Sequence, residues 1–200
     1  MNKTIYLASQ SHGRQQLLSE AQIPFTLIQQ SADEQACDWN QSLPDVVTSI
    51  AVHKMKHAII PAGSKNISEC VVLTADTLVQ SAKGVICGKS ESLEHAKKIL
   101  RELQGTVFVA TAFCLKSFEW NNNQWVTKTE HVQVVTSTLE FEMSDADIDK
   151  YIHTIDVLKI AGALQVEGYG SQFIKSVKGS YTNIIGLPMF ELVKSLQILE

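Results

Sequence analysis

Asp76 is the residue whose chemistry most needs an explanation, because it is the single carboxylate in the mostly apolar run of residues 70–79. The run is short and rich in β-branched residues, which predicts a buried strand. A carboxylate in such a strand costs free energy unless a cation pairs with it or a metal ion binds it. A turn centred on Ala82 and Lys83 would place Lys89 directly opposite Asp76 in a hairpin, and a turn centred one residue later would leave Lys89 one diagonal step away on the same face.

Asp76 and Lys89 allow two interpretations. Asp76 belongs to a buried salt bridge or a surface strand end, or it is a metal-binding carboxylate beside a phosphate-binding lysine. Glu34 follows a predicted strand and is a candidate second metal carboxylate or a solvated loop residue. Lys54 stands among other cationic and histidine side chains, which favours the solvent-facing side of a helix, and Glu167 is a candidate loop charge.

The amino-terminal segment has the pattern of an anion site. Residues 4–8 predict a short strand, and the small polar run that follows leads into a helix near Arg14. Such a helix start offers unpaired backbone N–H groups and a favourable dipole, and Ser9, Ser11 and Gly13 suit the turn. Arg14 would add a forked cationic donor that matches phosphate or carboxylate oxygens. The alternative is that these residues form an ordinary helix cap.

The remaining elements predict a mixed-sheet α/β fold in a single domain over residues 1–200. Strands are expected at 25–28, 70–79, 85–88, 106–118 and 125–142, the last two forming a long hairpin around 121–123. Helices are expected at 43–60, 92–103 and 144–154 and from Pro188 onward, after a glycine-rich tail that begins at Gly162. No internal repeat or linker divides the chain.

The composition excludes several classes of protein. With 200 residues and 44% hydrophobic side chains, the chain is long enough for a well-buried core. A net charge of -4 argues against a nucleic-acid polymer as the main partner. The four cysteines show no paired spacing, which favours reduced thiols. The start of the chain has no signal-peptide pattern and no run suits a membrane span, so we expect a soluble cytoplasmic protein.

Several short motifs occur together in an order that resembles the Maf family of nucleoside triphosphate pyrophosphatases. The motifs are residues 7–14 (LASQSHGR) with Leu17-Leu18, Asp33-Glu34, Ile50-Ala51 with Lys54, Ala75-Asp76-Thr77, Gly88-Lys89, and residues 179–188 (GSYTNIIGLP). The likeness extends from about residue 4 to residue 198. It implies an elongated mixed β-sheet flanked by helices, similar to the inosine triphosphatase fold, with two lobes around a nucleotide cleft. It also implies cleavage of a nucleoside triphosphate to the monophosphate and pyrophosphate, and it suggests a homodimer.

The resemblance also carries roles onto individual residues. The catalytic positions fall on Asp76, Lys54, Lys89 and Glu34, and the phosphate-binding positions fall on Ser9, Ser11 and Arg14. Because a triphosphate carries about four negative charges, we expect a divalent cation, Mg²⁺ or Mn²⁺, to screen them, with Asp76 and Glu34 as its carboxylate ligands.

Three positions that bear on base preference give conflicting signals. Gly13 replaces an arginine that many members have, and Glu167 replaces a glutamine. Thr77 has the form typical of members that act on thymidine and uridine triphosphates. A glutamate at position 167 is similar to what is found in members that prefer 7-methylguanosine triphosphate and in other branches. The preferred base therefore stays open.

Other functions fit the same residues. The missing arginine allows a catalytically weak nucleotide-binding regulatory protein linked to cell division. The family's name, which derives from septum formation, suggests an adaptor of cell division that acts through a protein partner. A phosphatase that releases orthophosphate is the nearest enzymatic alternative.

Overall fold

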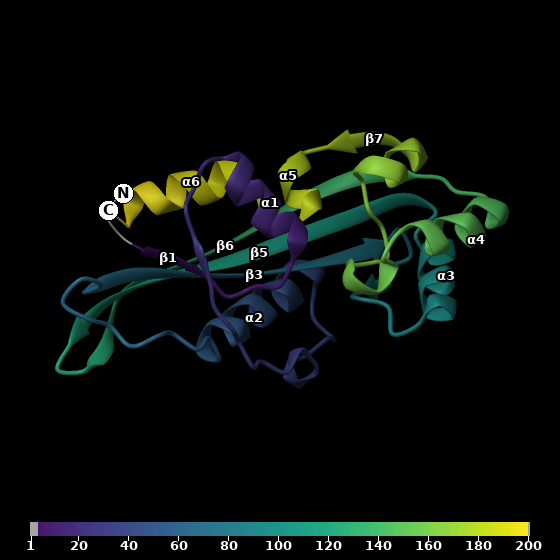
Figure 1. The fold of residues 1–200 in the computed structure, drawn as a ribbon. Helices are drawn as coiled ribbons and strands as arrows, with labels where there is room; N and C mark the ends of the chain where they lie inside the picture. The colour runs from purple at the N-terminus through teal and green to yellow at the C-terminus, as the bar shows by residue number, and fades with distance from the viewer. Residues whose placement is uncertain (1–3, 200) are drawn as a thin grey trace.

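The computed structural model describes residues 4–199 and contains one seven-stranded sheet with helices on both faces (Figure 1). The strands are β1 (Thr4–Leu7), β2 (Thr26–Leu27), β3 (Glu69–Ser81), β4 (Ile86–Cys87), β5 (Gly105–Asn121), β6 (Gln124–Phe141) and β7 (Ile174–Lys178). Their order is β2-β1-β3-β5-β6-β7, and β4 pairs with β3. β1 runs parallel to β2 and β3 while the other pairs are antiparallel, so the predicted mixed α/β sheet is confirmed.

The helices begin where short polar side chains can satisfy their free N–H groups. They are α1 (His12–Glu20), α2 (Leu43–Lys56), α3 (Leu93–Glu102), α4 (Asp145–Thr154), α5 (Tyr181–Ile185) and α6 (Met189–Ile198). Five of them follow a serine whose hydroxyl accepts a hydrogen bond from the first turn: Ser11, Ser42, Ser92, Ser144 and Ser180. Among residues 4–199, no helix is both long and apolar enough to span a membrane.

The alternation of β3 divides the core between two faces. Val71, Leu73 and Ala75 pack beneath α1 and α6, whereas Leu78 packs beneath α2 on the opposite face. α3 and α4 cover one end of the sheet (Figure 1). By the same alternation, Asp76 belongs to the face covered by α2 and its neighbour Thr77 to the face covered by α1.

One edge of β3 is open along part of its length. β1 pairs with β3 as far as Leu73, and β4 pairs with it only at Val79 and Gln80. Between these pairings, residues 74–78 have a strand neighbour on the β5 side only. Side chains from both faces of β3 can therefore reach the same space at this edge.

The predicted pairing of Asp76 with Lys89 is wrong. The hairpin pairs Val79 with Cys87, and Ser81 N donates to Val85 O around a three-residue turn that contains Gly84 at φ 87°. Both sequence-based registers assumed a two-residue turn, and one extra residue shifts the register between them. β4 also ends at Cys87, so Lys89 lies outside the hairpin.

The glycine-rich tail contains two elements that the sequence did not predict, β7 and α5. Asn183 in α5 is fully buried. Its Oδ1 accepts from Thr111 N at 3.1 Å, and its Nδ2 donates to Val109 O at 3.1 Å and to Ser137 Oγ at 3.0 Å. Buried polar groups need hydrogen-bond partners, and the Asn183 side chain supplies them to β5 and β6. These bonds hold the tail against the sheet.

Replacing Asn183 with Ala should destabilise the protein by about 3 kcal/mol, since three buried polar groups would lose a partner. Urea denaturation monitored by circular dichroism measures the loss. Asn40→Ala, at an exposed position, is the control and should change stability by less than about 0.5 kcal/mol. Equal effects of the two substitutions would contradict this account of the tail.

Candidate functional site

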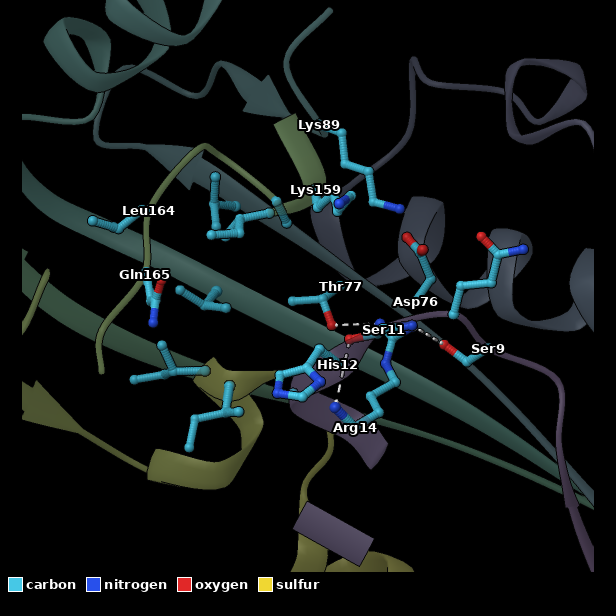
Figure 2. A pocket seen from close by; sticks show the side chains of 18 of the residues that line it. Ser9, Ser11, His12, Arg14, Asp76, Thr77, Lys89, Lys159, Leu164 and Gln165 are labelled. Atoms are coloured by element: carbon cyan, nitrogen blue, oxygen red, sulfur yellow. Dashed lines mark hydrogen bonds between the residues drawn. The ribbon is translucent and has the colours of Figure 1, made fainter. Parts of the chain in front are cut away.

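A cavity of about 820 Å³ opens at the unpaired edge of β3 (Figure 2). All ten residues singled out from the sequence line it: Ser9, Ser11, Gly13, Arg14, Glu34, Lys54, Asp76, Thr77, Lys89 and Glu167. They come from the β1–α1 loop, the start of α1, a 3-10 helix (Glu34–Ala36), α2, β3 and two later loops. The open strand edge brings these distant segments together.

Lys54 forms the centre of a charged cluster. Its Nζ lies 2.6 Å from Asp76 Oδ1 and 2.8 Å from Glu34 Oε1. Lys54 and Asp76 are both 6% exposed, so the expected solvent-facing position of Lys54 is wrong. Lys54 falls in the buried stripe of α2 together with Ile50 and Ala51, and its long side chain reaches Asp76 from that face.

The two carboxylates of this cluster have opposite pKa shifts. Burial raises the pKa of Asp76, and the attraction of Lys54 and Arg14 offsets only part of the effect. Burial also opposes the ionisation of Glu34, but the Lys54 ammonium, helped by Lys89 and Arg14, outweighs it and lowers the pKa of Glu34. Asp76 is thus the stronger proton acceptor of the pair when both are ionised.

One oxygen of Asp76 has no protein partner. Asp76 Oδ2 is buried and makes no hydrogen bond within the described residues. A buried carboxylate oxygen without a partner costs free energy, and such sites are explained by an absent ion, water or ligand. Asp76 and Glu34 both contact the Lys54 ammonium, so their carboxylates lie close together. Two such carboxylates would suit Mg²⁺ or Mn²⁺, with substrate phosphates as the remaining ligands. Residues 4–199 contain no group of three acidic, histidine or cysteine side chains placed to hold a metal alone.

Arg14 links three segments at the base of the cavity. Its Nε donates to Gly186 O at 2.8 Å, Nη1 to Ser9 Oγ at 3.0 Å and Nη2 to Thr77 Oγ1 at 2.9 Å (Figure 2). The guanidinium has five N–H donors, so these three bonds engage most of its capacity. Burial lowers the pKa of Arg14, an effect that Asp76 and Glu34 oppose, and the guanidinium stays charged.

Ser9 and Ser11 form the turn and the helix cap at the start of α1. Ser11 caps α1 by accepting from Arg14 N at 3.5 Å, and Ser11 N donates to Ser9 Oγ at 3.3 Å. The cap and the cavity wall are therefore made by the same residues. The helix cap is therefore confirmed, and the anion site at this loop stays a prediction.

Thr77, Gly13 and Glu167, the three positions that the resemblance links to base preference, differ in their hydrogen bonds and in the space around them. The Thr77 hydroxyl already accepts from Arg14 and lies 3.0 Å from Thr111 Oγ1. A Cβ at Gly13 would lie 3.1 Å from Ile185, so a larger residue would press on α5. Glu167 is half-buried, and burial followed by the charge of Glu20 raises its pKa. Of these three positions, Glu167 is the one whose side chain is ionisable.

The lining also includes polar residues that the sequence did not predict, among them His12, Asp156, Lys159 and Gln165. His12 begins α1 beside the predicted turn, so its position next to Gly13 was a usable signal. The other three lie in residues 156–165, a segment with no regular periodicity. A backbone bridge between Lys89 and Ala161 brings that segment to the cavity, and local sequence does not reveal such a contact.

Comparison with known proteins agrees with the geometry. A family model described as Maf-like protein matches residues 4–199. The chain is similar to a nucleoside triphosphate pyrophosphatase of Haemophilus ducreyi, with 34% identity over 198 residues that cover 98% of this chain and 95% of the relative. It is also similar to proteins named dTTP/UTP pyrophosphatase, with 33% identity in Bacillus cereus and 30% in Idiomarina loihiensis, each over 98% of this chain and 95% of the relative.

The raised pKa of Asp76 predicts how stability depends on pH. The folded protein holds this proton more tightly than the unfolded chain, in which the pKa of Asp is about 3.9. The stabilisation is complete below that value and is lost as the pH rises through the folded-state pKa. Relative to Asp76→Asn, the wild type should therefore lose stability as the pH rises, and the variant should be at least as stable at pH 7. Urea denaturation from pH 3 to pH 8 measures the difference, and a difference that grows in favour of the wild type would contradict it.

Proposed function

The chain belongs to the family of Maf-like proteins, and we propose that it is a metal-dependent nucleoside triphosphate pyrophosphatase that releases the monophosphate and pyrophosphate. The observation that carries this proposal is the cluster of Asp76, Lys54 and Glu34 in a cavity large enough for a nucleotide. Charged groups of both signs are needed at a phosphoanhydride. Carboxylates bind a metal ion or accept a proton from a water molecule, and cations stabilise the negative charge of the phosphate oxygens.

The phosphate chain is proposed to lie along the cationic side of the cavity. Lys54 and Lys89 supply ammonium groups, and Ser9 and Ser11 supply hydroxyl and backbone donors at the start of α1. Arg14 supports the loop that carries these serines and can direct its remaining N–H donors to the same anion. A divalent cation bound to Asp76 and Glu34 would neutralise phosphate charge and polarise the α-phosphorus.

Asp76 is proposed to accept the proton of the attacking water. Its Oδ2 is the unpartnered oxygen, and Lys54 holds Oδ1, which fixes the direction of the free oxygen. A pKa raised by burial makes the carboxylate a better base than an exposed Asp. Water attack at the α-phosphorus then expels pyrophosphate, whose charge Lys89 is placed to stabilise.

Glu167 and its neighbours are proposed to face the base. A carboxylate there accepts hydrogen bonds from adjacent N–H groups, as a guanine-type edge offers. The relatives named dTTP/UTP pyrophosphatase indicate a pyrimidine alternative for this chain.

Three further expectations rest on the family resemblance and belong to this proposal. They are a division of the fold into two lobes with the cavity between them, a homodimer, and a place in the cytoplasm. The cavity is lined both by Val79, Val109 and Leu164 of the cluster that packs around α3 and by Lys54 of α2, which supports the first. Light scattering of the purified chain measures its molar mass in solution and so tests the homodimer directly.

The reaction is tested by pyrophosphate release with Mg²⁺ or Mn²⁺ from thymidine, uridine, cytidine, guanosine, 7-methylguanosine and inosine triphosphates. At least one nucleotide should be cleaved, and Asp76→Asn should lower the rate at least about 100-fold because the proton acceptor is lost. Chelation of the metal by EDTA should stop the reaction, and added Mg²⁺ should restore it.

The same assay distinguishes the competing functions. Release of orthophosphate instead of pyrophosphate would favour a phosphatase. Tight nucleotide binding in calorimetry without any release would favour a regulatory binding protein. Either result would contradict the proposed activity.

Glu167→Gln should change the ranking of nucleotides. An amide presents one donor and one acceptor where the ionised carboxylate presents acceptors only, so kcat/KM for guanosine-type substrates relative to UTP should fall about tenfold. Glu20→Gln removes a nearby charge outside the cavity and is the matched control. An unchanged ranking in Glu167→Gln would remove the base-reading role of this residue.

A further inference from the structure

An ion pair at the rim of the cavity has no part in the reaction proposed above. Lys159 Nζ lies 2.7 Å from Asp156 Oδ2, and both residues line the cavity. Their side chains are 83% and 59% exposed, and Asp156 precedes a single turn of 3-10 helix (Val157–Lys159) that Lys159 ends. An exposed pair of this kind contributes little stability, so Lys159 can exchange its partner at small cost.

The backbone joins the segment that carries Lys159 to the segment that carries Lys89. A β-bridge joins Lys89 to Ala161, and Gly162 N donates to Gly88 O at 2.8 Å. The buried Ser90 hydroxyl donates to Val157 O at 3.2 Å. In the view of Figure 2, Lys159 is drawn near Lys89, whose side chain points toward Asp76. Lys89 and Lys159 thus come from two segments whose backbones are hydrogen-bonded to each other.

The segment is also pinned to the sheet. Gly162 has φ +63° and lies so close to Val79 of β3 that a Cβ would collide with it. Only glycine combines this approach with this backbone conformation. The base of Lys159 is therefore held firmly while its side chain extends to solvent.

The charge balance of the cavity shows why another cation is needed. Lys54 is shared by two carboxylates, and three donors of Arg14 are engaged by the protein. Of the cavity lysines Lys54, Lys89 and Lys159, Lys89 is the one that makes no ion pair within residues 4–199. A triphosphate brings about four negative charges, which one unpaired lysine and one divalent ion leave partly uncompensated.

We propose that Lys159 is a phosphate-binding residue that leaves Asp156 to bind the terminal phosphates of the substrate. This inference rests on the proposed function, because it takes the ligand to be a nucleoside triphosphate. Asp76 lies within the sheet and marks the reacting α-phosphorus, so the rim beside Lys89 is where the β- and γ-phosphates extend. Asp156 positions Lys159 in the free protein and competes with the phosphates for it.

The proposal predicts opposite effects for the two partners. Lys159→Met should raise KM about 3- to 10-fold, by the same factor for every nucleotide that is cleaved, with kcat changed less than about twofold, because a contact to phosphate does not read the base. Lys159→Arg should restore KM. Asp156→Asn should lower KM about 2- to 5-fold, and that gain should shrink in the Lys159→Met background.

The matched control is Lys83→Met. Lys83 is also an exposed lysine, 73% accessible and paired with Glu102 at 3.0 Å, but it does not line the cavity. It should leave KM unchanged. An equal rise of KM in the Lys83 and Lys159 variants would indicate a general effect of surface charge and would overturn the assignment.

Binding of inorganic triphosphate, measured by calorimetry, tests Lys159 without turnover. Lys159→Met should weaken it by a factor similar to the rise in KM, and unchanged affinity would overturn the proposal. If no nucleotide is cleaved, the proposed function fails while this binding measurement still decides the role of Lys159. If nucleotides are cleaved and neither KM nor triphosphate affinity changes, only the further inference fails.

Discussion

The buried contact between Lys54 and Asp76 is the interaction on which the site depends. Removing both charges from water is costly, and a pair in this position does more for the arrangement of groups than for stability. Glu34 shares the same ammonium, so a loop after β2 is joined to a helix and to a central strand. The cluster leaves one oxygen of Asp76 without a partner, and that oxygen is the group available for chemistry.

The rest of the fold keeps this cluster open to a ligand. Because β1 and β4 cover only parts of one edge of β3, residues 74–78 face a cavity where a regular sheet would have another strand. Arg14 ties the loop before α1 to β3 and to the turn after α5, so the cavity floor depends on contacts distant in sequence. Asn183 fixes the tail that completes this arrangement.

The sequence predicts most of the elements and the residues that meet in the cavity because each carries a local signal. Asp76 interrupts an apolar run, and Ser11 precedes a helix, so both stand out without a structure. The charge of Lys54 and of its neighbours predicts an exposed position, which is wrong because the spacing of Lys54 from Ile50 and Ala51 places it on the buried stripe of α2. The register of Lys89 depended on one residue in a turn, and Lys159 depends on a contact between distant segments, which local patterns do not encode.

The central claim is that the free oxygen of Asp76 directs water to the α-phosphorus of a nucleoside triphosphate. Hydrolysis in ¹⁸O-labelled water, with the products separated and weighed by mass spectrometry, tests it most directly. The account predicts one ¹⁸O atom in the nucleoside monophosphate, none in pyrophosphate, and loss of the labelled product in Asp76→Asn. Label in pyrophosphate would place the attack at the β-phosphorus and contradict the account, as would labelled monophosphate formed at an unchanged rate by the variant.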